Sequence, residues 1–389
     1  MNNFDYYNPT KIVFGTDTYH RIPEEIKNKI DAKKVLIVFG GGSIKKNGVY
    51  DEVMASLSDY AVYEFSGVEP NPEYTTLMKA VNVVKDENID FILAVGGGSV
   101  IDGVKFIAAA AHYKGDPWDV LSQKEGCSFS SAVPFGTVLT LPATGSEMNS
   151  GAVISRSELK QKRTMGGVFT FPVFSFLDPK VVSSLPKRQI ANGIVDAYMH
   201  TLEQYLTYPS DNLLQERIAE GILSTLIEIG PKVLESPEDI KLASNLMWCA
   251  TMALNGTLRA GVAYDWSTHM IGHELTALHG IDHARTLAIV APNLFKVKID
   301  NKREKLRQYG KRVFSLQGNC ELQAIEKTIE FFELLGISTK LTDYIDDLGN
   351  TASVIKERFS ERGWKGLGER KDLTPDEAEK IVEMSYYEN

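Results

Sequence analysis

The pattern of hydrophobic positions divides the chain into two parts with different periods. In the first part, short apolar runs rich in β-branched residues alternate with stretches whose apolar positions recur every three to four residues. Strand-like runs occur at 35–39, 61–65, 90–95, 137–141, 152–156 and 173–177, and helical spacing occurs at 45–57, 73–88 and 100–113. Strands and helices that alternate in this way predict βαβ units and a mostly parallel sheet.

The second part has a helical period throughout. Helices are expected near 188–207, 211–235, 239–258, 264–278, 283–299, 303–315, 321–335, 352–362 and 375–387, without a convincing strand. Pro186 and Pro375 stand where first helical turns would begin, and Gly280, Gly336 and Gly363 stand where helices would end. The change of period places a domain boundary near residues 180–186.

Four residues of the second part are typical metal ligands. Asp196 and His200 are four apart in the apolar-periodic run IANGIVDAYMHTLEQYL, so a helix places both on one face. His269 and His283 are fourteen residues apart, which at about 100° per residue is roughly 1400°, some 40° short of four turns. Even a helix interrupted at Gly280 could bring the two rings together. A lone buried histidine is more often bonded to backbone, but one carboxylate and three imidazoles suit Fe²⁺ or Zn²⁺.

A glycine-rich turn in the first part has the setting of a nucleotide site. Gly96, Gly97, Gly98 and Ser99 lie directly between the apolar run FILAV and a helical stretch. Glycines let a diphosphate approach the backbone, and the helix N-terminus offers N–H groups and a positive dipole end. The GxGxxG fingerprint is incomplete because Ile101 occupies its third position. An ordinary βα turn would carry the same glycines, and the strand–turn–helix context favours the dinucleotide interpretation.

A second glycine-rich turn bears on the choice of coenzyme. The residues that follow the apolar run VLIVF are Gly40, Gly41, Gly42 and Ser43. NAD-selective sites often carry an acid near this strand end, where it binds the ribose 2′-hydroxyl and would repel a 2′-phosphate. Glycines, a serine hydroxyl and the lysines at 45 and 46 favour NADP(H) instead. The alternative is a plain turn with solvated lysines.

Composition narrows the class of protein. The 389 residues, 43% of them hydrophobic, are enough for two domains with separate cores. A net charge of −9 argues against nucleic acid and anionic membranes as partners, and no apolar stretch approaches the length of a membrane span. The first residues lack the basic and apolar regions of a secretory signal, and the 3 cysteines form no CxxC pair. We therefore expect a cytoplasmic protein without a membrane or nucleic-acid partner.

These motifs together resemble the iron-containing (group III) alcohol dehydrogenases, most of all their branch of NADP-dependent butanol dehydrogenases and broad-range aldehyde reductases. The matching segments are FGGGSIKKNGVYDEV, GVEPNP, AVGGGSVIDGVKFIA, LPATGSE, NGIVDAYMHTLEQY and HMIGHELTALHGIDHARTLAIV. The resemblance implies a Rossmann-like α/β dinucleotide-binding domain over 1–184 and an all-helical metal-binding domain over 185–389, together a dehydroquinate synthase-like fold. It also implies a homodimer.

The resemblance implies a role for each candidate residue. One divalent metal would be bound by Asp196, His200, His269 and His283. The remaining family histidine corresponds to His273, which would lie beside the nicotinamide and could relay a proton. Cofactor contacts would come from Asn71, Gly97, Gly98, Ser99, Asp102, Thr140, Thr144 and Lys162. Lys162 lies in the charged run RSELKQKR, for which a solvated loop is the alternative, and His279 is expected not to be a ligand.

The function expected from residues and resemblance is reversible hydride transfer between NADP(H) and a small aliphatic alcohol or aldehyde, such as butanol or butanal. A metal would polarise the substrate oxygen, and an active site between the two predicted domains would follow. Two alternatives remain open at this stage. The same ligands suit a non-redox metal-dependent hydrolase or lyase, against which the glycine-rich turns argue. They also suit a non-catalytic NADP-binding protein with a structural metal.

Overall fold

The computed structural model describes residues 1–121 and 129–387, and its contacts group into two compact units. The sheet unit comprises residues 7–185 and 237–251, and the helical unit comprises residues 1–6, 186–236 and those from 252 onward. An α/β part with a parallel sheet followed by a helical part is the fold class that the hydrophobic pattern predicts.

A parallel sheet of six strands forms the centre of the sheet unit in the described residues, in the order β1-β8-β5-β4-β2-β3. Its strands are β1 (Lys11–Phe14), β2 (Lys34–Phe39), β3 (Ala61–Phe65), β4 (Phe91–Gly96), β5 (Phe135–Leu139) and β8 (Phe174–Leu177). A separate antiparallel pair consists of β6 (Ala152–Arg156) and β7 (Gln161–Met165). The central strands β2, β4 and β5 are apolar and buried on both faces, as parallel strands covered by helices must be.

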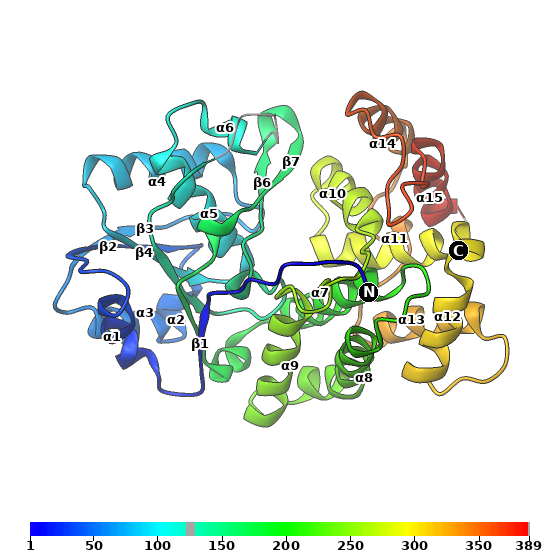
Figure 1. Ribbon diagram of the computed structural model, residues 1–389, viewed down its shortest axis with the longest axis horizontal. Coiled ribbons are helices and arrows are strands. Elements are labelled where there is room, and N and C mark those ends of the chain that lie inside the picture. Colours follow the sequence, from blue (N-terminus) through cyan, green and yellow to red (C-terminus); the bar gives the residue numbers. More distant parts are fainter. Residues whose placement is uncertain (122–128, 388–389) are drawn as a thin grey trace. The chain divides into compact units, whose positions relative to one another are not determined.

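Helices cover both faces of this sheet, with α4 and α5 on one face and α1 to α3 on the other (Figure 1). The α-helices are α1 (Ile22–Lys27), α2 (Ser43–Lys46), α3 (Val49–Ser56), α4 (Tyr74–Asp86), α5 (Gly98–His112) and α6 (Pro117–Val120). Short 3-10 helices are η1 (Tyr19–Arg21), η2 (Ser146–Met148), η3 (Ser157–Leu159), η4 (Val168–Thr170) and η5 (Pro179–Ser184). Helix α5 packs directly against β4 and is buried over most of its length, which explains its run of small apolar residues.

The strand order places both glycine-rich turns at one point of the sheet. From β2 the chain crosses to β3 at the edge, and then returns to β4 on the other side of β2. The order therefore reverses between β2 and β4, where ligands bind in open α/β sheets, beyond the carboxyl ends of the strands. The register pairs Phe39 with Val95, so the turns that follow β2 and β4 emerge side by side.

The strands differ from the sequence prediction in three places. The run at 137–141 lies two residues earlier, because β5 pairs Val138 with Val95 and ends at Leu139. Strand β1 was not predicted from its four residues; it exists because it pairs in parallel with β8. Strand β7 contains part of the charged run at 156–163 that was weighed as a solvated loop. Backbone pairing with β6, rather than hydrophobicity, makes it a strand.

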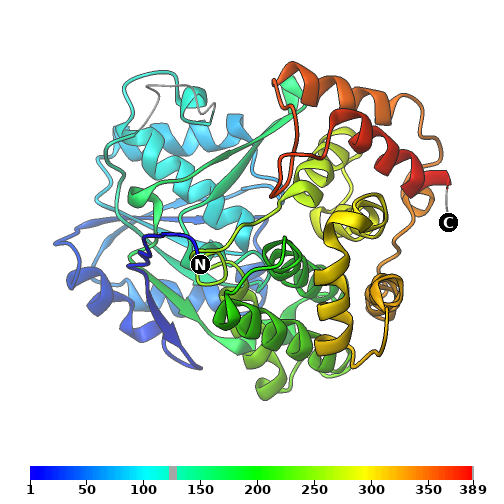
Figure 2. The ribbon, with the colours of Figure 1, turned by 45° about the vertical axis from the view of Figure 1, so that its right-hand side comes forward.

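Long helices make up the rest of the chain, most of them in the helical unit. Helix α9 is the exception, because most of its residues belong to the sheet unit. The helices are α7 (Lys187–Tyr205), α8 (Leu213–Glu235), α9 (Ile240–Ala253), α10 (Ser267–His279), α11 (His283–Val297), α12 (Ile299–Val313), α13 (Glu321–Leu334), α14 (Thr351–Glu361) and α15 (Pro375–Tyr387), with the 3-10 helix η6 (Leu341–Asp343). Figure 2 shows α7 and α8 (green) beside α12 (yellow). None of the helices in the described part of the chain has the length and apolar run needed to cross a membrane.

Helix ends follow the predicted proline and glycine signals more closely than the apolar period. Pro186 caps α7, and Gly280 adopts the left-handed φ of 69° that ends α10. The helix predicted at 45–57 is in fact two helices, because Gly48 adopts a φ of 84° that no helix continues through. The helix predicted at 264–278 begins later because Trp266 has a φ of 69°.

Two helix bounds elsewhere also differ from the prediction. The helix expected to reach 258 ends at Ala253, and the side chain of Asn255 accepts a hydrogen bond from the Thr257 N–H to form a turn. The helix predicted at 303–315 begins at Ile299, directly after α11. In the first case a local hydrogen bond sets a boundary that the apolar period leaves open.

The close packing of β5 against β8 yields a stability prediction. A methyl group at Gly136 would overlap the ring of Phe174, whereas one at Gly221, inside α8, would meet nothing within 4 Å. We expect Gly136→Ala to lower the free energy of unfolding by about 1–3 kcal/mol through overpacking. Gly221→Ala should raise it by about 0.5–1 kcal/mol, because alanine loses less backbone entropy in a helix. Denaturant unfolding followed by circular dichroism measures both, and an unchanged Gly136→Ala midpoint would contradict this packing.

Candidate functional site

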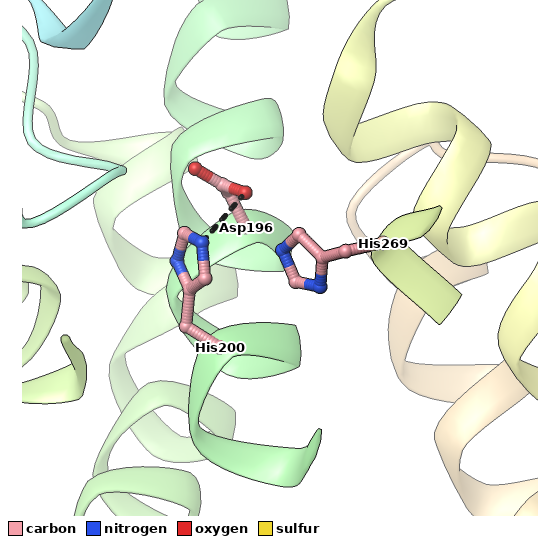
Figure 3. Close-up of side chains that lie close together, drawn as sticks. All are labelled: Asp196, His200 and His269. Atoms are coloured by element: carbon pink, nitrogen blue, oxygen red, sulfur yellow. Dashed lines mark ion pairs between the residues drawn. The ribbon is translucent and has the colours of Figure 1, made fainter. Parts of the chain in front are cut away.

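The helical unit gathers one carboxylate and two imidazoles from separate helices. Asp196 and His200 project from the same face of α7, and His269 projects toward them from the first turns of α10 (Figure 3). All three residues are buried, and one potential ligand atom of each lies within 4.8 Å of the others. The four-residue spacing therefore places Asp196 and His200 on one face of α7, as predicted. The tertiary fold brings His269 to the same place.

His283 joins this group through a sharp change of chain direction. Helix α10 ends at His279, and α11 begins at His283 after the turn at Gly280. The Nε2 atom of His283 lies 3.8 Å from Asp196 Oδ1, and its ring centroid lies 5.2 Å from that of His269. The structure thus brings all four predicted ligand residues together, although the helix between the last two is interrupted.

The start of α11 is fixed to α7 by Asp282, a residue that the sequence analysis did not identify. Its Oδ2 atom accepts hydrogen bonds from Arg188 Nε at 2.9 Å and from Asn192 Nδ2 at 2.7 Å, both on α7. These contacts lower the pKa of Asp282 despite its partial burial. The adjacent His283 is therefore held against α7 by its neighbour. Only the position of Asp282 next to a predicted ligand could have suggested this role.

The donor set fits a divalent cation. Asp196 is 4% exposed, and its Oδ1 atom accepts no hydrogen bond from the described residues. The same atom lies 3.8 Å from Nε2 of both His200 and His283. Two ligands of one tetrahedral metal, each about 2.1 Å from the ion, would stand about 3.4 Å apart. A buried carboxylate oxygen without a hydrogen-bond donor calls for a compensating positive charge, which a metal ion would supply.

Glu203 is a second residue that the sequence analysis missed. Its Oε2 atom accepts a hydrogen bond from His269 Nδ1, and Oε1 accepts one from the Thr268 N–H at 2.6 Å. This bond directs Nε2 of His269 toward the other ligand atoms, as second partners of metal-bound histidines generally do. Burial, followed by the nearby Asp265 carboxylate, raises the pKa of Glu203 to about 8. Glu203 follows His200 by three residues and Asp196 by seven, so all three lie on one face of the helix. This spacing is the sequence feature that could have identified Glu203.

His273 lies at the edge of the same group. It follows His269 by one turn of α10 and is 8% exposed. Its ring stacks on that of His283, with centroids 4.8 Å apart and an interplanar angle of 18°. His279, at the end of α10, instead makes a contact of 2.9 Å with the Thr351 hydroxyl. The ring of His273 therefore lies next to the candidate ligand His283, whereas His279 contacts Thr351 instead.

The turn after β2 leaves open space at its glycines. A methyl group at Gly41 or Gly42 would meet nothing within 4 Å, whereas one at Gly40 would lie 3.2 Å from the Val68 carbonyl oxygen. Ser43 then opens the short helix α2. This turn has the room that an approaching ligand needs, and Gly40 is the tightest of its three glycines.

One lysine beside this turn has an acidic neighbour. Lys45 Nζ lies 3.5 Å from Glu64 Oε2 on β3 and 4.3 Å from the centroid of the Tyr50 ring. The Tyr50 hydroxyl donates to the other oxygen of Glu64 at 2.7 Å. The ammonium of Lys45 is therefore held near the turn by an exposed ion pair rather than being simply solvated.

The turn after β4 is close-packed. Gly98 begins α5, and a methyl group there would overlap the Thr144 side chain. The Thr140 N–H donates to the Gly96 carbonyl at 3.0 Å, and Ser99 Oγ donates to the Pro70 carbonyl. Thr140 and Thr144, both predicted as cofactor contacts, thus lie next to the turn that was predicted to bind the pyrophosphate.

Lys162 and Asn71, two further predicted contacts, meet directly: Lys162 Nζ donates to Asn71 Oδ1 at 3.0 Å. The carboxylate of Asp102 accepts hydrogen bonds from Ser146 Oγ at 2.6 Å and from the Val153 N–H at 2.8 Å. Burial raises the pKa of Asp102. Lys162 therefore pairs with Asn71, and Asp102 is bonded to the segment that follows Thr144.

Family models for known proteins match both units. The model described as iron-containing alcohol dehydrogenase matches residues 9–179, and the C-terminal model of the Fe-containing alcohol dehydrogenase family matches residues 190–354. The chain belongs to the iron-containing alcohol dehydrogenase family. The resemblance inferred from the motifs is thereby confirmed, and so is the expected fold class.

Curated relatives extend over the whole chain. The NADPH-dependent aldehyde reductase YqhD of Escherichia coli is 51% identical, covering 99% of this chain and 100% of the relative. The probable NADH-dependent butanol dehydrogenase 1 of Bacillus subtilis is 42% identical with the same coverage of 99% and 100%. These two similar proteins differ in the coenzyme that their names give.

Solved structures agree with the fold. A crystal structure of E. coli YqhD matches with a TM-score of 0.94 at 50% identity, covering 99% of each chain. The NADH-dependent butanol dehydrogenase A of Thermotoga maritima matches with a TM-score of 0.93 at 38% identity, again over 99% of each chain.

The contact between Glu203 and His269 predicts an effect on metal affinity. Glu203→Gln keeps the size of the side chain but has a single acceptor oxygen, so it cannot accept from both Thr268 and His269, and affinity for Zn²⁺ should fall by about 10- to 100-fold. Competition with a chromophoric chelator measures this affinity, and Glu228→Gln, on the exposed face of α8, is the matched control. A Glu203→Gln protein that competes as well as the wild type would show that this contact does not orient a metal ligand.

Proposed function

We propose that this chain is an NADP(H)-dependent and divalent-metal-dependent alcohol dehydrogenase and aldehyde reductase that acts on small aliphatic alcohols and aldehydes. The observation that carries the proposal is the buried group of Asp196, His200 and His269. Family membership and 51% identity to a protein named NADPH-dependent aldehyde reductase support it. The relatives named butanol dehydrogenases support an alcohol or aldehyde of about four carbons as substrate.

The metal would be held by Asp196, His200, His269 and His283. Iron or zinc suits these ligands, and three neutral imidazoles with one carboxylate leave the site a net charge of about +1. A divalent metal there supplies Lewis acidity toward a carbonyl or alkoxide oxygen. Glu203 would hold His269 in one tautomer and orientation, and Asp282 would hold the helix turn that carries His283.

The coenzyme would bind at the carboxyl ends of the sheet strands and supply the hydride. Its contacts are proposed to be Gly40, Gly41, Gly42, Ser43, Asn71, Gly97, Gly98, Ser99, Asp102, Thr140, Thr144 and Lys162. The backbone N–H groups at the start of α5 suit a diphosphate. Open space at Gly41 and the nearby Lys45 ammonium favour a 2′-phosphate, and hence NADP(H) over NAD(H).

His273 is proposed to relay the proton between the substrate oxygen and solvent. Its burial and its stacking on His283 keep it next to the candidate ligands. A non-redox hydrolase or lyase would need neither glycine-rich turn, and we therefore do not favour it. The domain boundary at 184/185, the homodimer and the cytoplasmic location remain predictions from sequence.

The reaction itself is tested by following NADPH oxidation with butanal. Metal-stripped protein should be inactive, and Fe²⁺ or Zn²⁺ should restore turnover. His200→Ala should lose metal and reduce the rate by about a hundredfold or more, because a ligand is gone. His279→Ala, on the same helix as His269 but bonded to Thr351, should behave as the wild type. A His200→Ala protein with full metal content and rate would overturn the proposed site.

Coenzyme choice is tested at Gly41, where a new side chain has room, rather than at Gly40, where the Val68 carbonyl is close. Gly41→Asp places a negative charge near the expected 2′-phosphate, and about 1 kcal/mol of repulsion lowers the NADPH-to-NADH ratio of kcat/KM about fivefold. Gly41→Asn has the same size without the charge and should leave the ratio unchanged. Equal ratios for both variants would mean that this turn does not read the 2′-phosphate.

A further inference from the structure

A buried polar cluster in the sheet unit joins α5 to the segment after β5. Lys105, on α5, is 0% exposed. Its Nζ atom donates hydrogen bonds to Ser146 Oγ at 2.6 Å, the Gly151 carbonyl at 2.7 Å and Asn149 Oδ1 at 3.0 Å. A lysine ammonium has three N–H donors, so all of them are used. The three acceptors compensate for the water that the buried ammonium has lost, so Lys105 has a structural role in this cluster.

Asp102 completes the cluster one turn earlier on α5. Its Oδ1 atom accepts from the Ser146 hydroxyl at 2.6 Å, and Oδ2 accepts from the Val153 N–H at 2.8 Å. The Ser146 hydroxyl thus accepts from the Lys105 ammonium and donates to the Asp102 carboxylate. This arrangement compensates both charges and fastens residues 146–153 along α5.

The fastened segment continues from the turn that packs on the start of α5. Thr144 Oγ1 accepts from the Ser146 N–H at 3.2 Å, and Asn149 Nδ2 donates to the Gly145 carbonyl at 2.8 Å. Thr144 in turn fills the space where a side chain at position 98 would lie. The two residues that Lys105 holds, Ser146 and Asn149, therefore determine where Thr144 stands relative to Gly98.

We propose that Lys105 is a positioning residue for NADP(H): its ammonium holds segment 144–151 so that Thr144 stands over Gly98 at the first turn of α5. This inference rests on the proposed function, because it takes that turn as the pyrophosphate site. Lys105 is fully buried and acts through the segment rather than by touching the cofactor.

Other contacts hold the segment independently of Lys105. Ser175 Oγ donates to the Glu147 carbonyl at 2.6 Å, and Thr251 Oγ1 donates to the Glu147 carboxylate at 2.5 Å. Loss of the Lys105 ammonium should therefore loosen residues 149–151 and Thr144 while the segment stays attached at Glu147. The expected change is in cofactor binding more than in folding.

The proposed role of Lys105 predicts that NADPH binding depends on pH, because the charge of the ammonium does. Burial lowers the pKa of Lys105 to about 8, although the Asp102 and Glu147 carboxylates act in the opposite direction and raise it. Lys162 of β7 acts on Asp102 in the opposite sense to burial. As pH rises through about 8 the ammonium loses one donor, so NADPH binding should weaken over this range.

The test is titration of the purified full chain with NADPH, followed by nicotinamide fluorescence at several pH values between 7 and 9. Lys105→Met should weaken binding about tenfold at pH 7, equivalent to about 1.4 kcal/mol, and should abolish the further loss with pH. Lys85→Met, an exposed lysine on α4, is the matched control and should bind like the wild type. Circular dichroism establishes that each variant is folded.

Ser146→Ala removes one acceptor of the Lys105 ammonium and is a milder change than Lys105→Met. It tests the same inference if Lys105→Met does not fold. It should also weaken NADPH binding, and the double variant should lose less than the product of the two effects, because both break one link. Folded variants that bind NADPH like the wild type overturn this inference alone. A wild-type protein that binds no NADPH overturns the proposed function and this inference with it.

Discussion

The burial of Asp196 is the constraint on which the helical unit depends. Its carboxylate lies inside a helix bundle, 4% exposed, with no hydrogen bond to Oδ1 from the described residues. Burial of a carboxylate without a compensating positive charge is strongly unfavourable, and a metal ion held by the surrounding side chains would supply that charge. The fold places His200, His269 and His283 around it. The convergence of α7, α10 and α11 is thus inseparable from the requirement to compensate one charge.

The candidate ligands are held in turn by residues outside the group of four. Glu203 orients His269 and is itself next to Asp265, which forms an ion pair of 2.8 Å with the buried Lys302. Asp282 holds α11 against α7 through Arg188 and Asn192. These partners leave the candidate ligands little freedom of orientation, which favours the fixed geometry that a catalytic metal needs.

The dinucleotide that we propose for the sheet unit imposes a different constraint, because it must be able to approach the backbone at the ends of the strands. Reversal of strand order between β2 and β4 brings two glycine turns to one edge. One of these turns is open at Gly41, and the other is packed against Thr144. Lys105 and Asp102 satisfy each other through Ser146 beneath the packed turn. A fully bonded buried network of this kind fixes the position of a loop more firmly than apolar packing does.

The sequence by itself determined the fold class, the two periods, the helix stops at prolines and glycines, and four ligand-type residues with their spacing. These features are local: helical geometry relates Asp196 to His200, and a glycine ends α10 whatever surrounds it. Only the tertiary structure showed the contacts of Glu203 with His269, of Asp282 with α7 and of Lys105 with Ser146. Each of these contacts joins residues far apart in the chain. The energy of such a contact depends on how deeply the two residues are buried and on which side chains meet. Neither can be derived from the spacing of residues along the sequence.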